Sequence, residues 1–341
     1  MMLRQGRFPR AREREGDTHA VISPGLRRTL VCLAAGAVLT GGCGQKAEQK
    51  APIGSPANPI KMAFVPSLDT GKITLSAERL ARELEKRTGY TIEVTVPVSY
   101  AAVIEAMGAG RVDVAWFAPL SYVLANSKYG AKVLLITERD GHTDYTGIIL
   151  ARKDSGIRRI EDLKGRRFAF GDPLSTSGTL YPKQLLKAHG IDPDTDITPV
   201  FAGGHDKAII ALYNGQVDGC SCYSGYGSDA RDRVVSTIPD IKEKTVIIGR
   251  TAKIPNDNVA VSADLPEEVA QKLKRALLDI SASAEGRQML MEVAEIDGLR
   301  EVDDSVYDSV RKMVQDVGLD LQEYLRRDEE KQKQKAAGKK G

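Results

Sequence analysis

The stretch that decides the fold runs Gly171-Asp-Pro-Leu-Ser-Thr-Ser-Gly-Thr-Leu-Tyr-Pro182. A strand-like run at 167–170 precedes it, and a run with leucines at helical spacing follows it. In a strand, loop and helix of this kind, the first helical amides have no intrahelical partners and the helix dipole adds positive potential. The loop therefore favours a small oxyanion. The alternative is that a hydroxyl of Ser175, Thr176 or Ser177 only caps the helix.

Strand-like and helix-like runs alternate on both sides of this loop, with β-branched residues concentrated in the strands. The predicted strands are 60–65, 91–96, 112–116, 133–137, 144–152, 197–201, 217–220, 246–248 and 255–261. The predicted helices are 75–84, 103–107, 120–129, 208–213, 265–283, 286–294 and 306–325, with a helical turn at 160–163. This order predicts an α/β protein with mainly parallel sheets flanked by helices.

The 341 residues are enough for two domains of ordinary size. We expect two lobes, lobe 1 made of residues 59–146 plus 256–326 and lobe 2 of residues 147–255. The chain would cross between them twice, outward along 144–152 and back along 255–261. Because ligands of open α/β sheets lie beyond the carboxyl ends of strands, the cleft between the lobes is the expected site.

Residues 1–43 have the pattern of an export signal. Arg27 and Arg28 precede the apolar core Leu30–Leu39, which is too short to span a bilayer, and small residues follow it. Cys43 comes next, and this end resembles the lipobox of bacterial lipoproteins, in which the Cys is acylated. It departs from that pattern because Leu39 lies four residues before the Cys, not three. An ordinary secretory signal is the alternative.

The charge of the chain is unevenly distributed. Residues 1–42 carry seven Lys or Arg and three acids, so removing them takes the net charge from +3 to −1. A chain of this charge gives no reason to expect nucleic acid as a partner. Residues 44–58 are predicted to be a tether and residues 327–341 a disordered tail, because neither has apolar residues to bury. Residues 1–26 are long and charged for the start of an export signal, which suggests either an unstructured extension or a translation start further along the chain.

Two of the four cysteines, Cys220 and Cys222, lie outside the signal segment. Their spacing has no second pair with which to complete a zinc site. We interpret them as small buried residues, with a disulfide as the alternative. The sequence predicts no metal and no cofactor, because it has no zinc, phosphate-loop or dinucleotide motif.

Five motifs in order resemble the phosphate/phosphite/phosphonate-binding proteins of ABC importers, over about residues 60–324. They are Tyr100–Met107, Val112–Trp116, Gly171–Gly178, Ala202–Asp206 with Val217-Asp218 after it, and Ile254–Asp257. The resemblance implies a type II periplasmic binding protein whose hinged lobes capture a phosphonate, phosphite or phosphate. It also implies ABC permease subunits as partners, a location in the periplasm or on the outer membrane face, and a lipid-anchored monomer.

The resemblance also implies roles for single residues. The hydroxyls and amides of the 175–177 loop would donate to the ligand oxygens, His205 would donate from the facing loop with increasing charge as it protonates, and Tyr100 and Tyr145 would donate from the other lobe. Because these donors converge only when the cleft shuts, ligand binding would be coupled to closure.

Each of these residues also has a plain structural alternative. His205 and Asp206 could form a surface pair that caps a helix, and Tyr100 and Trp116 could be core residues. Asp257 could occupy a turn after Pro255.

One departure from the family pattern limits the class of substrate that we expect. Family members that take aminoalkylphosphonates hold the amine with two carboxylates; one matches Asp257, but the other falls near Gly225. The neighbouring run offers Ser and Tyr instead, with Asp229 and Asp232 further on. Without the second carboxylate an ammonium group loses charge-assisted recognition, which favours phosphate, phosphite or a small alkylphosphonate.

Three other functions are compatible with the sequence. A hydrolase could use Ser177, His205 and Asp206 or Asp257, but the nucleophile-elbow motif is missing and we expect no enzyme. A ligand-sensing domain for a membrane sensor would have the same fold and site. A binding protein for another oxyanion, such as a sulfonate, is the third.

Overall fold

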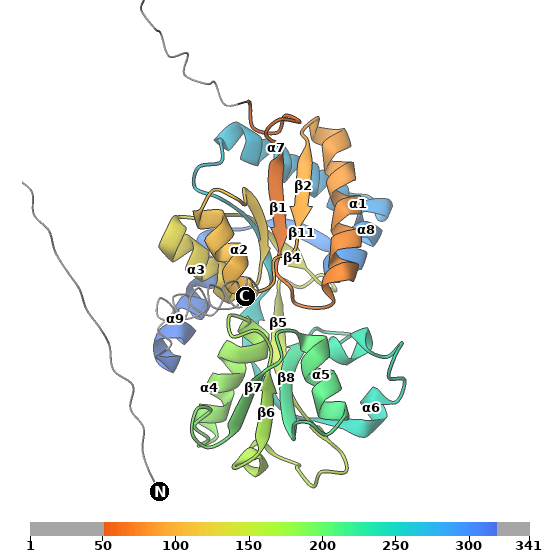
Figure 1. The fold of residues 1–341 in the computed structure, drawn as a ribbon, viewed down its shortest axis with the longest axis vertical. Coiled ribbons are helices and arrows are strands. Elements are labelled where there is room, and N and C mark those ends of the chain that lie inside the picture. The colour runs from red at the N-terminus through yellow and green to blue at the C-terminus, as the bar shows by residue number, and fades with distance from the viewer. Residues whose placement is uncertain (1–50, 319–341) are drawn as a thin grey trace, which may run out of the picture. The chain divides into compact units, whose positions relative to one another are not determined.

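The computed structural model describes residues 51–318. The predicted signal segment, the predicted lipidation site Cys43 and the predicted tail 327–341 lie outside the described residues. The described chain forms two lobes, each with a mixed sheet and flanking helices (Figure 1).

Lobe 1 is built on a six-stranded sheet in the order β11-β4-β10-β3-β1-β2. Its strands are β1 Ile60–Phe64, β2 Ile92–Thr95, β3 Val114–Phe117, β4 Lys132–Glu138, β10 Asn258–Val261 and β11 Gly298–Glu301. Its helices are α1 Thr70–Thr88, α2 Tyr100–Gly108, α3 Pro119–Tyr129, α7 Glu267–Ala282, α8 Ala284–Ala294 and α9 Asp308–Val317.

Alternate side chains of the lobe 1 strands enter two separate cores, as the pleat of a strand requires. Ala63 and Ala115 face the core that contains α2 and α3. Phe64 and Trp116 face the core that contains α1, α7 and α8. The sheet is therefore covered on both faces (Figure 1).

Lobe 2 is built on a five-stranded sheet in the order β7-β6-β8-β5-β9. Its strands are β5 Asp144–Arg152, β6 Arg167–Phe170, β7 Thr198–Phe201, β8 Gly219–Ser224 and β9 Thr245–Pro255. Its helices are α4 Tyr181–Ala188, α5 His205–Tyr213 and α6 Ile241–Lys244, with short turns at Ile160–Leu163, Thr176–Leu180 and Ala230–Arg233. Cys220 and Cys222 are free and buried in β8.

Both sheets contain antiparallel pairs, where the sequence predicts mainly parallel ones. β1 pairs in parallel with β2 and β3, and β6 with β7 and β8. β10, β4 and β11 pair antiparallel in lobe 1, and β5 with β8 and β9 in lobe 2. In lobe 1, β10 follows the return crossing from lobe 2 and lies between β3 and β4, antiparallel to both.

The two crossings lie side by side and form the hinge. β4 leads into β5, β9 leads into β10, and Asp144 of β5 pairs with Pro255 of β9. Asn256 ties the crossings together, because its side-chain amide donates to the carbonyls of Thr137 and His142, each at 2.9 Å.

Three local features differ from the sequence predictions. Residues 51–58 were predicted as part of a free tether, yet Ser55 and Asn58 form a β-bridge and Ile53 packs against the core of lobe 1. β11 was not predicted, since its four residues have no clear apolar alternation. Helix α9 ends at Val317, where Gly318 adopts φ 69°, whereas the predicted helix ran through 306–325.

Helix α9 contacts both lobes. A hydrogen bond joins Ser309 to Tyr181 of α4, and the Lys187 ammonium of α4 donates to the Val317 carbonyl at 3.0 Å. On the lobe 1 side, Arg311 of α9 donates to the Asn126 side chain of α3 at 3.1 Å. No helix among residues 51–318 has the length and apolar content needed to cross a membrane.

Candidate ligand-binding site

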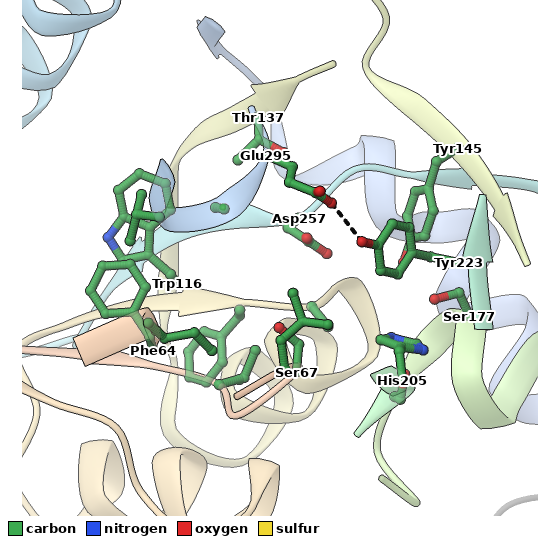
Figure 2. Close-up of a pocket in the computed structure, with 18 of the residues that line it drawn as sticks. Phe64, Ser67, Trp116, Thr137, Tyr145, Ser177, His205, Tyr223, Asp257 and Glu295 are labelled. Carbon is green, nitrogen blue, oxygen red and sulfur yellow. Dashed lines mark hydrogen bonds between the residues drawn. The ribbon is translucent and has the colours of Figure 1, made fainter. Parts of the chain in front are cut away.

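A cavity of about 80 Å³ lies where the two lobes meet, and both lobes line it. Six of the seven predicted ligand-binding residues are in its wall: Tyr100, Tyr145, Ser175, Ser177, His205 and Asp257. Figure 2 shows Tyr145, Ser177 and His205 on the same side of this cavity. The structure thus brings together residues that lie up to 157 positions apart in the sequence.

The loop after β6 caps a helical turn and also lines the cavity, so the two roles predicted from the sequence do not exclude each other. Ser175 caps the following helical turn, because its hydroxyl accepts a hydrogen bond from the Gly178 amide at 3.0 Å, and it also lines the cavity. The turn Thr176–Leu180 is a wide π-helical turn that continues into α4. Gly178 is needed there, since an added Cβ would lie 2.8 Å from the Ser175 hydroxyl and 3.1 Å from His205 Cε1.

Thr176 does not line the cavity. Its hydroxyl accepts a hydrogen bond from the Leu120 amide at 2.9 Å, at the first turn of α3 in the other lobe. Pro119 begins α3 without a side-chain cap, so Thr176 supplies the cap from across the cleft. The expectation that this hydroxyl faces the ligand is therefore wrong.

Two phenols extend the polar wall. Tyr100 begins α2 and is hydrogen-bonded to Ser175, and Tyr145 of β5 is hydrogen-bonded to Ser177. The expectation that Tyr145 donates from lobe 1 is wrong, because β5 is part of the lobe 2 sheet. Burial raises the pKa of both phenols well above the usual value, and nearby carboxylates, Asp257 in both cases, raise it further. Both tyrosines therefore keep their protons at neutral pH and serve as hydrogen-bond donors.

His205 is buried at the start of α5, with 5% of its surface exposed, which excludes the surface pair with Asp206. Its ring stands nearly perpendicular to that of Tyr223, with centroids 5.1 Å apart. Burial lowers its pKa from 6.5 to about 4, so the imidazole is neutral at pH 7. The expectation of partial positive charge on this ring is therefore wrong for the protein without ligand. Nδ1 is buried and has no hydrogen-bond partner among the described residues.

Two arginine–carboxylate pairs in the wall were not predicted from the sequence. Arg139, just after β4, donates to Asp257 at 2.9 Å. Arg233 pairs with Glu295, and the Tyr223 hydroxyl donates to the same carboxylate at 2.5 Å (Figure 2). The second pair joins the lobes, because Tyr223 and Arg233 belong to lobe 2 and Glu295 ends α8 in lobe 1. The sequence contains one indication of the Arg139 pair: Arg139 follows the carboxyl end of a strand, where ligand-binding residues are expected.

The lobes are closed on each other. The His205 amide donates to the Ser67 carbonyl at 3.1 Å, and the Ser121 hydroxyl donates to the Leu174 carbonyl at 3.4 Å. The Leu120–Thr176 bond and the Glu295 pair bridge the same cleft. The cavity is therefore enclosed between two lobes in contact with each other.

Several polar residues considered from the sequence are used elsewhere. Asp229 forms a buried ion pair with Arg231 at 2.7 Å, and Asp232 pairs with Lys242, so neither replaces the carboxylate missing at Gly225. Gly225 itself lines the cavity. Within residues 51–318, no three His, Cys, Asp or Glu side chains are grouped to hold a metal ion.

Comparison with known proteins gives one consistent result. The family model described as "ABC transporter, phosphonate, periplasmic substrate-binding protein" matches residues 62–307. The chain is 33% identical to the Phosphate-import protein PhnD of Mycolicibacterium smegmatis, covering 63% of this chain and 70% of that protein. It is 26% identical to the Phosphonates-binding periplasmic protein of Escherichia coli, covering 61% and 62%.

Solved structures have the same fold. A binding protein of an ABC phosphonate transporter from Pseudomonas aeruginosa superposes with a TM-score of 0.70 at 21% identity, covering 85% of this chain and 99% of that one. PhnD1 of Prochlorococcus marinus, solved with methylphosphonate, superposes with a TM-score of 0.67 at 18% identity, covering 76% and 98%. Because the family model matches most of this chain, the chain belongs to the phosphonate-type periplasmic substrate-binding proteins of ABC transporters.

Proposed function

We propose that this protein captures a phosphorus oxyanion, namely a phosphonate, phosphite or phosphate, in the cavity between its lobes and delivers it to an ABC permease. The observation that carries this proposal is the convergence of neutral donors from both lobes. Tyr100 comes from lobe 1, while Tyr145, Ser175, Ser177 and His205 come from lobe 2. A tetrahedral anion accepts hydrogen bonds in several directions, which suits donors placed on both sides.

The charges around the cavity support recognition by hydrogen bonds. Arg139 is offset by Asp257 and Arg233 by Glu295, so the charge of each arginine is already balanced by a carboxylate of the protein. The anion's charge would be met by phenols, hydroxyls and the first amides of the helical turn after Ser175. Such charge-assisted hydrogen bonds are roughly twice as strong as neutral ones.

The named relatives support the same ligand class. The Mycolicibacterium smegmatis protein is a phosphate-import protein, and the Prochlorococcus marinus structure holds methylphosphonate. We transfer to this chain only what they share, which is an anion with a phosphorus centre.

The geometry does not favour hydrolysis. Ser177 is hydrogen-bonded to Tyr145 and not to a histidine, and Asp257 is paired with Arg139. Nδ1 of His205 faces no carboxylate among residues 51–318. A nucleophile, base and orienting acid are therefore not aligned.

Anchoring by a lipid at Cys43 and function as a monomer belong to the same proposal. A diacylated Cys43 would hold the protein at a membrane face beside its permease. Labelling cells with a fatty-acid analogue tests the anchor: we expect a labelled wild type and an unlabelled Cys43→Ser variant. If the wild type is also unlabelled, Cys43 is not acylated and residues 1–43 are an ordinary secretory signal.

Isothermal titration calorimetry of the purified full-length chain tests the ligand class. We expect at least one of phosphate, phosphite and methylphosphonate to bind, and sulfate to bind more weakly. His205→Ala should weaken that binding by about 1–3 kcal/mol, because it removes a donor from a desolvated site. If none of the three binds, or if sulfate binds best, the proposed ligand class is wrong.

A further inference from the structure

The cavity has a polar end and an apolar end. The polar end holds the phenols, serines and imidazole already described. The apolar end lies deeper in lobe 1 and is lined by Phe64, Leu68, Ile73, Trp116 and Val293. Figure 2 shows Phe64 and Trp116 on the opposite side of the cavity from Tyr145 and Ser177, with Asp257 between.

The apolar end belongs to the packed core of lobe 1. The rings of Phe64 and Trp116 stack with centroids 5.3 Å apart and planes 13° apart, and both side chains are buried. Ile73 of α1 and Val293 of α8 belong to the same core cluster. Apart from the indole Nε1 of Trp116, which is buried and has no hydrogen-bond partner among the described residues, this wall offers water few hydrogen bonds, whereas an apolar group of a ligand gains contact with it.

Both carboxylates that face the cavity are already neutralised. Asp257 accepts from Arg139, whose guanidinium also donates to the Ala294 carbonyl at 3.2 Å and whose side chain is only 17% exposed. Glu295 is held by Arg233 and Tyr223. A ligand ammonium group at this point would find no free carboxylate and would meet a buried guanidinium of the same charge.

We propose that the ligand is a phosphonate whose substituent is uncharged and apolar, and that Arg139 is the residue that rejects an ammonium group. The anion would lie at the polar end and the carbon substituent would extend past Asp257 toward Phe64 and Trp116. This inference rests on the proposed function, since it needs a phosphorus oxyanion at the polar end.

A matched pair of ligands tests the inference without any substitution. n-Propylphosphonate and 2-aminoethylphosphonate have the same length, and they differ in a methyl group against an ammonium group. By calorimetry on the full-length chain we expect n-propylphosphonate to bind at least tenfold more tightly. We also expect affinity to rise from methyl- to n-propylphosphonate by about fourfold per methylene, the value for a buried CH₂.

Two variants test the role of Arg139. Arg139→Met keeps the length of the side chain but frees Asp257, so it should reduce or reverse the preference for n-propylphosphonate over 2-aminoethylphosphonate. Adding Asp257→Asn to that variant removes the freed carboxylate and should abolish the gain for the amine. Thermal unfolding identifies any variant that fails to fold, and the wild-type ligand pair then decides alone.

The outcomes separate the inference from the proposed function. Equal or tighter wild-type binding of 2-aminoethylphosphonate overturns the inference, and so does methylphosphonate binding as tightly as n-propylphosphonate. If phosphate or phosphite binds but no phosphonate does, the inference fails while the proposed function stands. If no phosphorus oxyanion binds, the proposed function fails.

Discussion

His205 shows at the residue scale how burial sets the chemistry of the site. Its ring lies against Tyr223 and next to Gly178, and its pKa falls to about 4 because the charged form loses its water. A neutral imidazole offers one N–H donor and one acceptor. A ligand anion beside it would favour the protonated form, so binding and protonation of this ring are linked.

This pKa predicts a pH dependence of stability. The unfolded imidazole takes up a proton below about pH 6.5 but the folded one only below about pH 4, so the unfolded state binds more protons in between. The contribution of His205 to the free energy of unfolding is constant above pH 6.5 and falls as the pH drops toward 4, by up to about 3 kcal/mol.

Urea unfolding of the wild type and of His205→Gln, which cannot titrate, measures this contribution. Their difference in free energy of unfolding should change between pH 7 and pH 4.5, with the wild type losing more stability. An unchanged difference would mean that the ring is not buried as described.

Gly178 gives a second prediction at this scale. In Gly178→Ala the new Cβ must displace either the Ser175 hydroxyl or the His205 ring, both of which line the cavity. We expect phosphonate affinity to fall by roughly 5- to 150-fold, which corresponds to a cost of about 1–3 kcal/mol for overpacking.

Gly171→Ala is the matched control for this variant, since its Cβ would lie 3.5 Å from the nearest atom, an ordinary contact. Calorimetry should find near-normal affinity in the control. Equal losses in both variants would contradict the close packing described at Gly178.

At the scale of elements, the first turn of α3 depends on a residue of the other lobe. The Leu120 amide has its acceptor in Thr176 only when the cleft is shut. Thr176→Val removes that acceptor without touching the cavity wall, so the closed state should lose about 0.5–1.5 kcal/mol. Because the ligand needs the closed state, affinity should fall roughly 2- to 10-fold.

Thr179→Val separates closure from stability. The Thr179 hydroxyl donates to the Asp172 carbonyl at 2.8 Å within lobe 2. This control should lower the free energy of unfolding but leave ligand affinity and the small-angle scattering profile unchanged. If the two variants bind equally well, Thr176 does not contribute to closure.

Elements also show what the sequence could and could not predict. The strand at 144–152, the turn at 160–163 and the strand at 167–170 have the predicted bounds, because their signals are local. The direction of β10 was not predictable, since it depends on which gap in the sheet receives the returning chain. β10 enters between β3 and β4, antiparallel to both.

At the scale of the whole molecule, too, the sequence predicts site residues with local signals better than contacts between distant segments. Ser175 and Ser177 were predicted from a loop whose chemistry is local, and Tyr100, Tyr145 and Asp257 from the family resemblance; all five line the cavity. Arg139 was missed because its partner Asp257 lies 118 residues away and meets it only through the order of the strands. Thr176 was misplaced because its acceptor role depends on the other lobe.

The whole molecule therefore works as two half-sites joined by a hinge. Lobe 2 contributes the serine loop and His205, lobe 1 contributes Tyr100 and the apolar end, and Asn256 holds the two crossings together. Neither half surrounds an anion alone. Capture of the ligand is then a property of the closed form, which the hinge makes accessible.

The most direct test of this account is a crystal structure of the protein grown with methylphosphonate. We predict that the phosphonate group lies between the lobes, with its oxygens within hydrogen-bond distance of Tyr100, Tyr145, Ser175 or Ser177 and the His205 ring, and its methyl group directed toward Trp116. A phosphonate bound outside the interlobe cavity, or held by donors of one lobe only, would contradict the account.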